Sequence, residues 1–464
     1  MNTSTCPRIV IIGAGISGLL SALALSKEGH AVTVLEREPE VGGVCRSYRV
    51  GPYKVDTGPH IITRLQDGPL RTLIDDYFET APVFVPHGEY HVRTQDKVRT
   101  FPWTLKSFAL FDLLPKTDRI ELIQAITSAY SQRALGLLND DIPVLDVVRD
   151  RSLSERTLSF LDIMCQFMTG VGMDKTPLTR FFDSLDYKNK RQVQDPLDYL
   201  NGIRNIITKK GAQDQQYPKG GVQTLVTSIL SSLPEGRVDI RTSCEATRIR
   251  VEGGRVSAVE TPEEDLPADI VIYSTYASDL PQYVDALPTS YAQRLRSLEK
   301  VRSLTLWLGL DTRLFTNNGS EIWIDSTPPC WVVPTSDYDE SLAPSGHQVV
   351  GCTTTLPAGA DIDAFKTQFL AALYRQMPGI EDHITMTHWQ VLVPEKAAWV
   401  VRQEMPSCRT PIKGLYLVGT DTMRKSMGVT RASYSVLTLL EALAADDVLE
   451  KGGQARRGRG HEDS

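Results

Sequence analysis

A glycine-rich turn near the N-terminus constrains the fold of this chain more than any other feature. The run 9–12 is apolar and β-branched, and it leads into Gly13, Gly15 and Gly18 in the pattern G-x-G-x-x-G. Residues 19–25 then place Leu and Ala at helical spacing. Gly13 permits the tight turn, Gly15 lets a pyrophosphate approach the backbone at the helix N-terminus, and Gly18 lets the helix pack closely on the strand. The stretch therefore predicts the strand, turn and helix of a dinucleotide-binding Rossmann domain.

An acidic residue follows at the spacing that this fold requires. Residues 31–35 form a second β-branched strand, which ends in Glu36. An acid about twenty positions after the glycines hydrogen-bonds a ribose 2′-OH in such folds, and it argues against the 2′-phosphate of NADP. We expect Ile16 and Ser17, between the glycines, and Arg37, next to the acid, to line the same site.

A second pair of glycines lies just beyond this acid. Gly42 and Gly43 are followed by Arg46 and Ser47, and the segment 56–60 reads Asp-Thr-Gly-Pro-His. The two glycines let the backbone pass close to a cofactor, and the planar guanidinium of Arg46 suits a phosphate or a ring edge. The residues alone leave a surface turn with a solvated arginine as the alternative.

The order of these motifs resembles that of the flavin amine oxidase superfamily, which includes phytoene desaturases and protoporphyrinogen oxidases. The resemblance implies that the cofactor is FAD, not NAD. It also assigns a further set of residues to FAD binding, namely Gly42, Gly43, Arg46, Ser47, Gly58, Pro59 and His60.

The other half of the resemblance lies near the C-terminus. An apolar strand over 414–418 ends at Gly419, and a helix rich in Leu and Ala begins at Gly428 and Val429. In the superfamily such a helix points its N-terminus at the flavin, where free N–H groups stabilise negative charge. Relatives have Gly-Asp after the strand, whereas this chain reads Gly419-Thr420-Asp421. Either Thr420 or a displaced Asp421 is expected to take the place of that aspartate.

The resemblance also implies a discontinuous architecture. The segment 217–221 resembles a Tyr-Pro-x-Gly-Gly element of the desaturases, and Ala246 matches a residue that touches the adenine in the superfamily. The expected fold class is α/β: a discontinuous Rossmann-like FAD-binding domain with an α+β substrate or cap domain. The expected FAD-binding domain comprises 1–85, 212–286 and 395–450, the cap domain comprises 86–211 and 287–394, and 451–464 form a flexible tail.

Composition excludes several other classes. The formal net charge of −7 gives no basic footprint for nucleic acid. The seven cysteines are scattered without metal-ligand spacing and indicate reduced thiols and no metal site. No segment reaches the roughly eighteen apolar residues that a membrane span needs, and the polar start indicates no secretory signal. We expect a cytoplasmic protein, with at most peripheral contact to the inner face of a membrane.

Two cap segments admit alternative interpretations. Residues 101–138 contain amphipathic helix patterns, which in phytoene desaturases and protoporphyrinogen oxidases correspond to a region that covers substrate and touches membrane. Their charges are mixed in sign, which favours packing on the domain's own core, because membrane-lying helices usually carry a basic polar face. The run 167–173 contains two Met, two Gly and one Phe. Met and aromatic residues in such a run belong to a protein core more often than to the wall of a substrate site, so a core role is favoured.

The chemistry expected of this chain is that of its cofactor. A flavin carries out the hydride or electron transfer, and the protein orients, desolvates and tunes it. His60 could bind substrate or move a proton, and Arg431 could clamp an anion or the flavin edge. Each also has a plain structural interpretation, as a turn-capping histidine and a surface charge.

The hypothesis that best fits the motifs is desaturation, dehydrogenation or isomerisation of a prenyl or carotenoid-like hydrophobe. The alternatives are a protoporphyrinogen-oxidase-like enzyme, a soluble amine or amino-acid oxidase, and a non-enzymatic flavin scaffold. The sequence leaves the electron acceptor, the reaction direction and the oligomeric state open.

Overall fold

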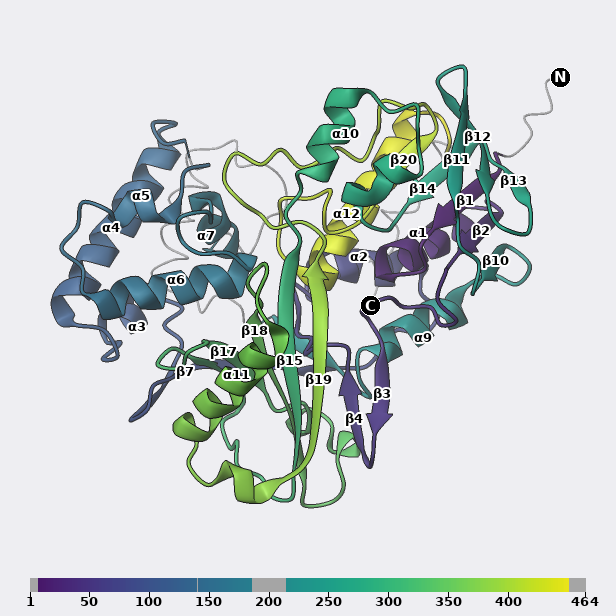
Figure 1. Ribbon diagram of the computed structural model, residues 1–464. Coiled ribbons are helices and arrows are strands. Elements are labelled where there is room, and N and C mark those ends of the chain that lie inside the picture. The colour runs from purple at the N-terminus through teal and green to yellow at the C-terminus, as the bar shows by residue number, and fades with distance from the viewer. Residues whose placement is uncertain (1–6, 140, 186–213, 450–464) are drawn as a thin grey trace, which may run out of the picture.

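The computed structural model describes residues 7–139, 141–185 and 214–449 (Figure 1). The predicted tail at 451–464 and residues 186–211 of the predicted cap segment lie outside these ranges. Within them, the chain builds two large sheets from interleaved parts of the sequence.

The first sheet is fully parallel and has the strand order β10-β2-β1-β14-β20. All four residues of strand β1 are β-branched and buried, as is usual for strands covered on both faces. The strand bounds are Ile9–Ile12 for β1, Val32–Leu35 for β2, Val238–Arg241 for β10, Ile270–Tyr273 for β14 and Leu415–Leu417 for β20. The strands come from the N-terminal, middle and C-terminal parts of the chain, and the expected α/β fold with a Rossmann-like sheet is confirmed.

Different layers cover the two faces of this sheet. Ile9 and Ile11 face a cluster built by four helices, whereas Val10 and Ile12 face a cluster on the other side. The four helices are α1 (Ile16–Lys27), α2 (Pro69–Tyr77), α9 (Gln223–Ser232) and α12 (Gly428–Ala445). The opposite layer contains β11 (Arg248–Glu252), β12 (Arg255–Glu260), β13 (Asp265–Pro267), η1 (Ala277–Gln282) and α10 (Thr289–Arg296). Because α10 packs here, we propose that the second cap segment begins after this helix and not at residue 287.

The second sheet has the order β19-β15-β18-β17-β16-β7-β8. Its bounds are Glu89–Arg93 for β7, Val98–Thr100 for β8, Val301–Leu310 for β15, Gly319–Trp323 for β16, Cys330–Val333 for β17, Gln348–Thr355 for β18 and Ile384–Glu395 for β19. The alternation of β15 separates its two faces. Leu304, Leu306 and Leu308 pack with helix α11 (Ile362–Gln376), which leaves Ser303 and Thr305 on the other face.

A helical layer covers the far part of that other face. It consists of α3 (Leu105–Ala109), α4 (Lys116–Ala134), α5 (Val144–Val148), α6 (Glu155–Thr169) and α7 (Leu178–Leu185). Leu122, Ala129 and Tyr130 of α4 are buried within this layer, so one face of the segment 101–138 packs on its own core, as favoured from sequence. In the part of the chain that the structure describes, no helix has the length and apolarity to cross a bilayer.

Two smaller sheets complete the fold. The hairpin of β3 (Ser47–Val50) and β4 (Tyr53–Asp56) follows the second glycine pair. The strands β5 (Ile62–Thr63), β6 (Phe84–Pro86) and β9 (Gln215–Pro218) form the other sheet.

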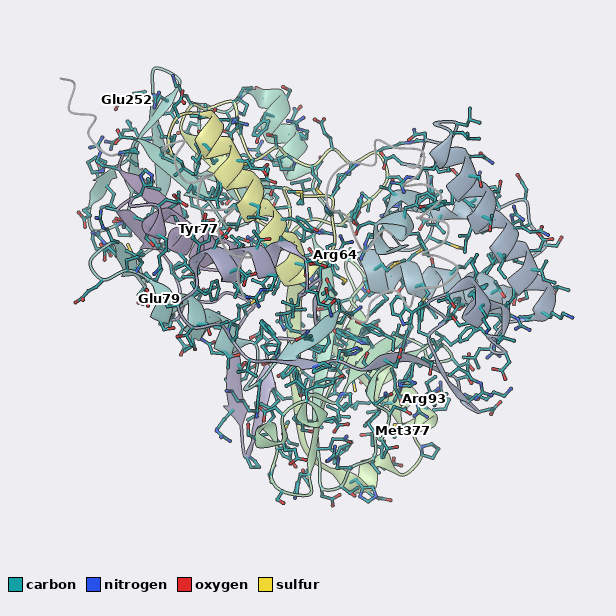
Figure 2. All side chains as sticks on the ribbon, turned by 180° about the vertical axis from the view of Figure 1, so that it is seen from behind. Arg64, Tyr77, Glu79, Arg93, Glu252 and Met377 are labelled. Carbon is teal, nitrogen blue, oxygen red and sulfur yellow. The ribbon has the colours of Figure 1, made fainter. Side chains whose placement is uncertain are left out.

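The two halves of the molecule meet at the N-terminal end of α12. The strands β15 and β19 of the second sheet extend to this point, as Figure 1 shows. Arg64 lies there between the halves (Figure 2), where its guanidinium donates to the Asp183 backbone oxygen at 2.7 Å and to the Tyr434 hydroxyl at 3.3 Å. Since Asp183 belongs to α7 and Tyr434 to α12, this buried arginine joins the helical cap to the cofactor domain.

Candidate active site

A cavity of about 490 Å³ runs along the junction of the two halves. One end lies at the first turn of α1 and at the carboxyl ends of β2 and β14, and the other lies between the cap sheet and α6. Among the predicted site residues, those that line it are Gly13, Gly15, Ile16, Ser17, Glu36, Arg37, Gly43, Gly58, Pro59, His60, Ala246, Thr420, Gly428 and Val429. The others, Gly18, Gly42, Arg46, Ser47, Gly419, Asp421 and Arg431, do not line it.

The three glycines of the first turn have different local environments. Gly13 has φ +100°, which favours glycine, and its N–H donates to the Leu35 oxygen at 2.8 Å. A Cβ on Gly18 would lie 2.0 Å from the Gly13 oxygen, so only glycine lets α1 pack this closely. A Cβ on Gly15 would meet no atom within 4 Å among the described residues, and Gly15 lines the cavity. The space above Gly15 is thus open for a ligand at the helix N-terminus, where anions are stabilised.

Glu36 is fixed at the edge of the same end. It is 9% exposed, its Oε2 accepts from the Ala14 N–H at 2.8 Å, and its Oε1 accepts from the Glu38 N–H at 3.0 Å. Its carboxylate lines the cavity beside Ala246 and Cys244. Each carboxylate oxygen has a second lone pair, so Glu36 can still accept from a ribose hydroxyl.

The second glycine pair, Gly42 and Gly43, packs against the first glycine-rich turn. Gly42 and Gly43 have φ +111° and +58°, and a Cβ on Gly43 would lie 3.2 Å from the Cα of Gly15. Arg46 donates to the Gly43 oxygen at 3.0 Å. Ser47 donates to Asp56 Oδ1 at 2.6 Å, which ties the hairpin together. Arg46 and Ser47 therefore hold this segment in shape from behind, and their direct contact with FAD stays a prediction.

The Gly-Thr-Asp segment has one residue at the cavity and one turned away. Thr420 lines the cavity, and its hydroxyl oxygen accepts from the Lys396 N–H at 3.0 Å, which leaves the O–H as a donor. Asp421 is buried behind it, where its Oδ2 accepts from the Ala277 N–H at 2.6 Å. Burial raises the pKa of Asp421, and the nearby Lys396 opposes that rise. Of the two alternatives left open by the sequence, the geometry favours Thr420.

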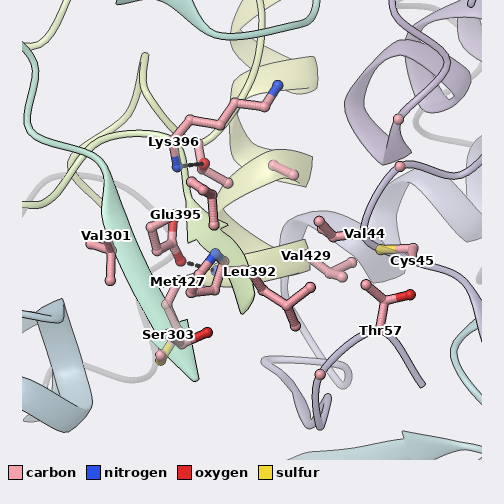
Figure 3. A pocket seen from close by; sticks show the side chains of 18 of the residues that line it. Val44, Cys45, Thr57, Val301, Ser303, Leu392, Glu395, Lys396, Met427 and Val429 are labelled. Atoms are coloured by element: carbon pink, nitrogen blue, oxygen red, sulfur yellow. Dashed lines mark hydrogen bonds between the residues drawn. The ribbon is translucent and has the colours of Figure 1, made fainter. Parts of the chain in front are cut away.

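Two charged residues at the end of β19, Glu395 and Lys396, line the cavity although no motif pointed to them. Figure 3 shows their side chains extending in different directions, Glu395 toward Met427 and Lys396 away from it. Lys396 Nζ donates to the Ser274 oxygen at 2.5 Å, and burial lowers the pKa of Lys396. A buried ammonium at this edge of the sheet suits an anionic or hydroxyl group of a ligand.

Glu395 lies against the N-terminus of α12. Its Oε1 accepts from the Gly428 N–H at 2.5 Å, and its Oε2 lies 3.1 Å from Arg431 Nη1. That ion pair is not aligned as a hydrogen bond, so Oε2 has no hydrogen-bond donor among the described residues. Arg431 is 1% exposed and donates also to the backbone oxygens of Ser426, Ala397 and Thr420. Arg431 thus holds Glu395 and the loop before α12, and its predicted direct contact with the cofactor is not supported by its position.

His60 lines the cavity next to Gly58 and Pro59. Its Nδ1 is 2.8 Å from the Gly58 oxygen, and because a carbonyl only accepts, Nδ1 carries the proton in this contact. The neutral ring then has Nε2 as its basic nitrogen. The Gly58 N–H donates to Gln390 Oε1 at 2.8 Å, which fixes the loop to β19.

The cap end of the cavity is lined by rings and by hydroxyls. Tyr90, Phe167 and Trp331 form an aromatic group, with the Phe167 and Trp331 ring centroids 5.5 Å apart and the Tyr90 and Phe167 centroids 5.8 Å apart. Phe167 and Met168 were favoured as core, but both line the cavity while also packing on the helical core. The hydroxyl residues are Ser303, Thr305, Thr353, Thr354 and Thr355.

The chain matches the family described as "Flavin containing amine oxidoreductase" over residues 16–434, and it belongs to this family. Its class is therefore that of FAD-dependent oxidoreductases, which confirms the resemblance and the cofactor stated from sequence. The open space above Gly15, the fixed carboxylate of Glu36 and the N-terminus of α12 at the same cavity fit this cofactor.

Particular relatives and structures agree with this class. The chain is 50% identical over 101 residues to an uncharacterised protein of Methanothermococcus thermolithotrophicus, which covers 22% of this chain and 97% of that protein. It is 25% identical over 424 residues to phytoene dehydrogenase of Streptomyces griseus, covering 80% of this chain and 79% of the relative. Among solved structures, an oxidoreductase from Methanosarcina mazei aligns with a TM-score of 0.77 at 20% identity, covering 94% of this chain and 100% of that one. This last likeness shows the shared fold.

Proposed function

We propose that this enzyme desaturates or dehydrogenates, or alternatively isomerises, a carbon–carbon bond of an extended hydrophobic molecule of the prenyl or carotenoid type. The observation that carries the proposal is the shape of the cavity. It continues past the N-terminus of α12 into a chamber lined by Tyr90, Phe167 and Trp331. The similarity to phytoene dehydrogenase of Streptomyces griseus supports the same substrate class.

Rings and aliphatic groups bind such a molecule by removing its surface from water. Ile163, Met168 and Ile322 add aliphatic surface to the aromatic chamber. At about 25 cal/mol per Å² of apolar surface, a C20 chain gains several kcal/mol after the cost of association. A small amine has too little surface to use this chamber.

The protein's own groups divide the remaining work. FAD, when bound, supplies the hydride acceptor. Gly15 leaves room for the pyrophosphate at the N-terminus of α1, and Glu36 is placed to accept from a ribose hydroxyl. Gly428 and Val429 begin α12 at the cavity. The Gly428 N–H already donates to Glu395, and the helix dipole favours negative charge at the rest of this first turn.

Removing a hydride from one carbon of a C–C bond requires a proton acceptor for its neighbour. His60 is suited to that role, because the Gly58 oxygen fixes its Nδ1–H and leaves Nε2 as the base. Glu395 also lines the cavity, and Arg431 acts on it as a positioning residue. The cytoplasmic location, the peripheral membrane contact and the electron acceptor stay predictions.

A chain-length series tests the proposal. The affinity of the oxidised holoenzyme for prenyl compounds is expected to fall at least about tenfold for each isoprene unit removed, because each buried methylene contributes about 0.8 kcal/mol. Phe167→Ala should weaken binding of the longest compound and leave FAD content unchanged, since Phe167 lies on the cap side of the cavity. Leu110→Ala is the matched control, because Leu110 is 72% exposed and lies outside the cavity. Equal affinity for all chain lengths would reject the proposal.

A further inference from the structure

The cap end of the cavity carries a hydroxyl patch on two neighbouring strands. In the antiparallel pairing of β15 with β18, Ser303 lies opposite Thr355, and Thr305 lies opposite Thr353. Residues two apart in a strand share a face, so these four side chains form one surface, and all four line the cavity. We call Ser303, Thr305, Thr353 and Thr355 the hydroxyl patch.

Half of this patch is already hydrogen-bonded and half is not. The Thr305 and Thr353 hydroxyls bond each other at 2.9 Å. Ser303 is only 9% exposed, and neither its hydroxyl nor that of Thr355 makes a hydrogen bond within the ranges that the structure describes. Figure 3 shows the Ser303 oxygen directed away from its own strand into the cavity. The Ser303 hydroxyl has no partner among the described residues, so it remains available to hydrogen-bond a ligand in the cavity.

The aromatic wall has the opposite character. The Tyr90 hydroxyl donates to Gln215 Oε1 at 2.5 Å, and Trp331 Nε1 donates to the Ser320 oxygen at 2.9 Å. Because their polar atoms are engaged by the protein, these residues have only ring surface left for a ligand. The cavity therefore has a polar wall and an apolar wall.

The hydroxyl patch and the aromatic wall adjoin each other on the cap sheet, where Trp331 of β17 lies opposite Thr353 of β18. The patch lies on β15 and β18, whereas Trp331 lies on β17 and Tyr90 on β7, farther from β19. Ser303 is also paired with Leu392 of β19, and a Cβ on Gly58 would lie 2.9 Å from Leu392 Cδ1. A Cβ on Gly351 of β18 would lie 3.3 Å from Pro59 Cβ, so the strands that carry the hydroxyl patch lie next to the loop that carries His60.

We propose that the substrate is an oxygenated isoprenoid, with a neutral hydroxyl or carbonyl oxygen near its reacting carbons that Ser303 and Thr355 recognise. This inference rests on the proposed function and narrows it from hydrophobes in general. A neutral oxygen fits because the patch itself offers hydroxyls, which bond neutral oxygens, and no cation to compensate the charge of an anion. The apolar remainder of the molecule lies against Tyr90, Phe167 and Trp331.

The test compares two saturated C20 ligands that differ in one oxygen, phytanol and phytane, each supplied from cyclodextrin. Binding is measured by tryptophan fluorescence on the anaerobic, photoreduced holoenzyme, which can neither oxidise nor reduce a saturated chain. Phytanol is expected to bind about fivefold more tightly than phytane, the ratio given by one neutral hydrogen bond of about 1 kcal/mol. The double variant Ser303→Ala, Thr355→Val should bring the two affinities together.

The matched control is Thr387→Val, because Thr387 lies exposed on β19 of the same sheet and outside the cavity. This variant should keep the fivefold preference. Equal binding of both ligands to the wild-type protein overturns the inference and leaves the proposed function standing, whereas binding of neither overturns both. Loss of FAD from the double variant would mean that the patch serves the cofactor, which also overturns the inference.

Discussion

The glycines at positions 15 and 18 provide a matched pair of substitutions that separate cofactor binding from folding. Gly15 has φ −71° and ψ 178°, which alanine adopts without strain, and its added Cβ meets no described atom within 4 Å. Gly15→Ala should therefore leave the apoprotein as stable as wild type, or up to about 1 kcal/mol more stable through a less flexible unfolded chain. Its methyl group, however, projects into the space that a pyrophosphate needs, so FAD affinity should fall at least tenfold.

Gly18→Ala should behave in the opposite order. Its Cβ would lie 2.0 Å from the Gly13 oxygen and 3.2 Å from Ser274 Oγ, so α1 must move away from β1. Overpacking of this kind costs about 1–3 kcal/mol or more, and it acts on the apoprotein whether or not FAD is present. Thermal unfolding of the apoproteins and fluorescence of FAD released on denaturation measure the two effects. Wild-type FAD content in Gly15→Ala, or wild-type apoprotein stability in Gly18→Ala, would refute the reasoning.

Three further predictions concern buried ionisable side chains. Arg431→Met leaves the buried Glu395 carboxylate without its ion-pair partner, so urea unfolding should show a free energy of unfolding lower by about 3–5 kcal/mol. Adding Glu395→Gln should recover part of this loss. An Arg431→Met variant as stable as wild type would contradict the prediction. Burial lowers the pKa of His87 to about 3, so between pH 6.5 and 3 only the unfolded state takes up the proton. The free energy of unfolding should therefore fall as pH drops through this range, by up to about 1.4 kcal/mol per pH unit. His87→Phe should remove this slope, and an unchanged slope would count against the prediction. Burial raises the pKa of Asp118, but hydrogen bonds from Ser154 and Thr157 outweigh this effect and hold the pKa at about 2. The stability that the ionised carboxylate contributes is present above its ordinary pKa of 3.8 and is lost as pH falls to about 2. Asp118→Asn should therefore abolish this acid-sensitive part of the pH dependence of unfolding.

The cofactor half of the site was predictable because its signals are local. Gly13, Gly15, Gly18 and Glu36 come from one contiguous strand, helix and strand unit, and their roles follow from turn geometry and spacing. The helix pattern within 101–138 and the strand over 414–418 were also predictable from periodicity, with boundaries shifted by a few residues. The sequence could not choose between Thr420 and Asp421, because the position of Asp421 depends on Ala277, whose backbone N–H binds it from a distant loop.

The substrate half depends on contacts between strands that are far apart in sequence. Ser303 and Thr355 become neighbours only through the register of β15 with β18, and neither belongs to a motif. Trp331 and Phe167 meet because α6 packs on the sheet, and their apolar character equally fits a core. The ion pair of Arg431 with Glu395 was not visible from sequence for the same reason, since it joins two separate elements.

The central claim is that the cavity presents an extended hydrophobe to FAD. Mixing the oxidised holoenzyme anaerobically with isoprenoids of C20 or longer, with a tetrapyrrole and with small amines, and following the loss of visible flavin absorbance, tests it most directly. The account predicts rapid bleaching by an isoprenoid and little by amines. Rapid bleaching by a small polar amine, with no response to any isoprenoid, would contradict it.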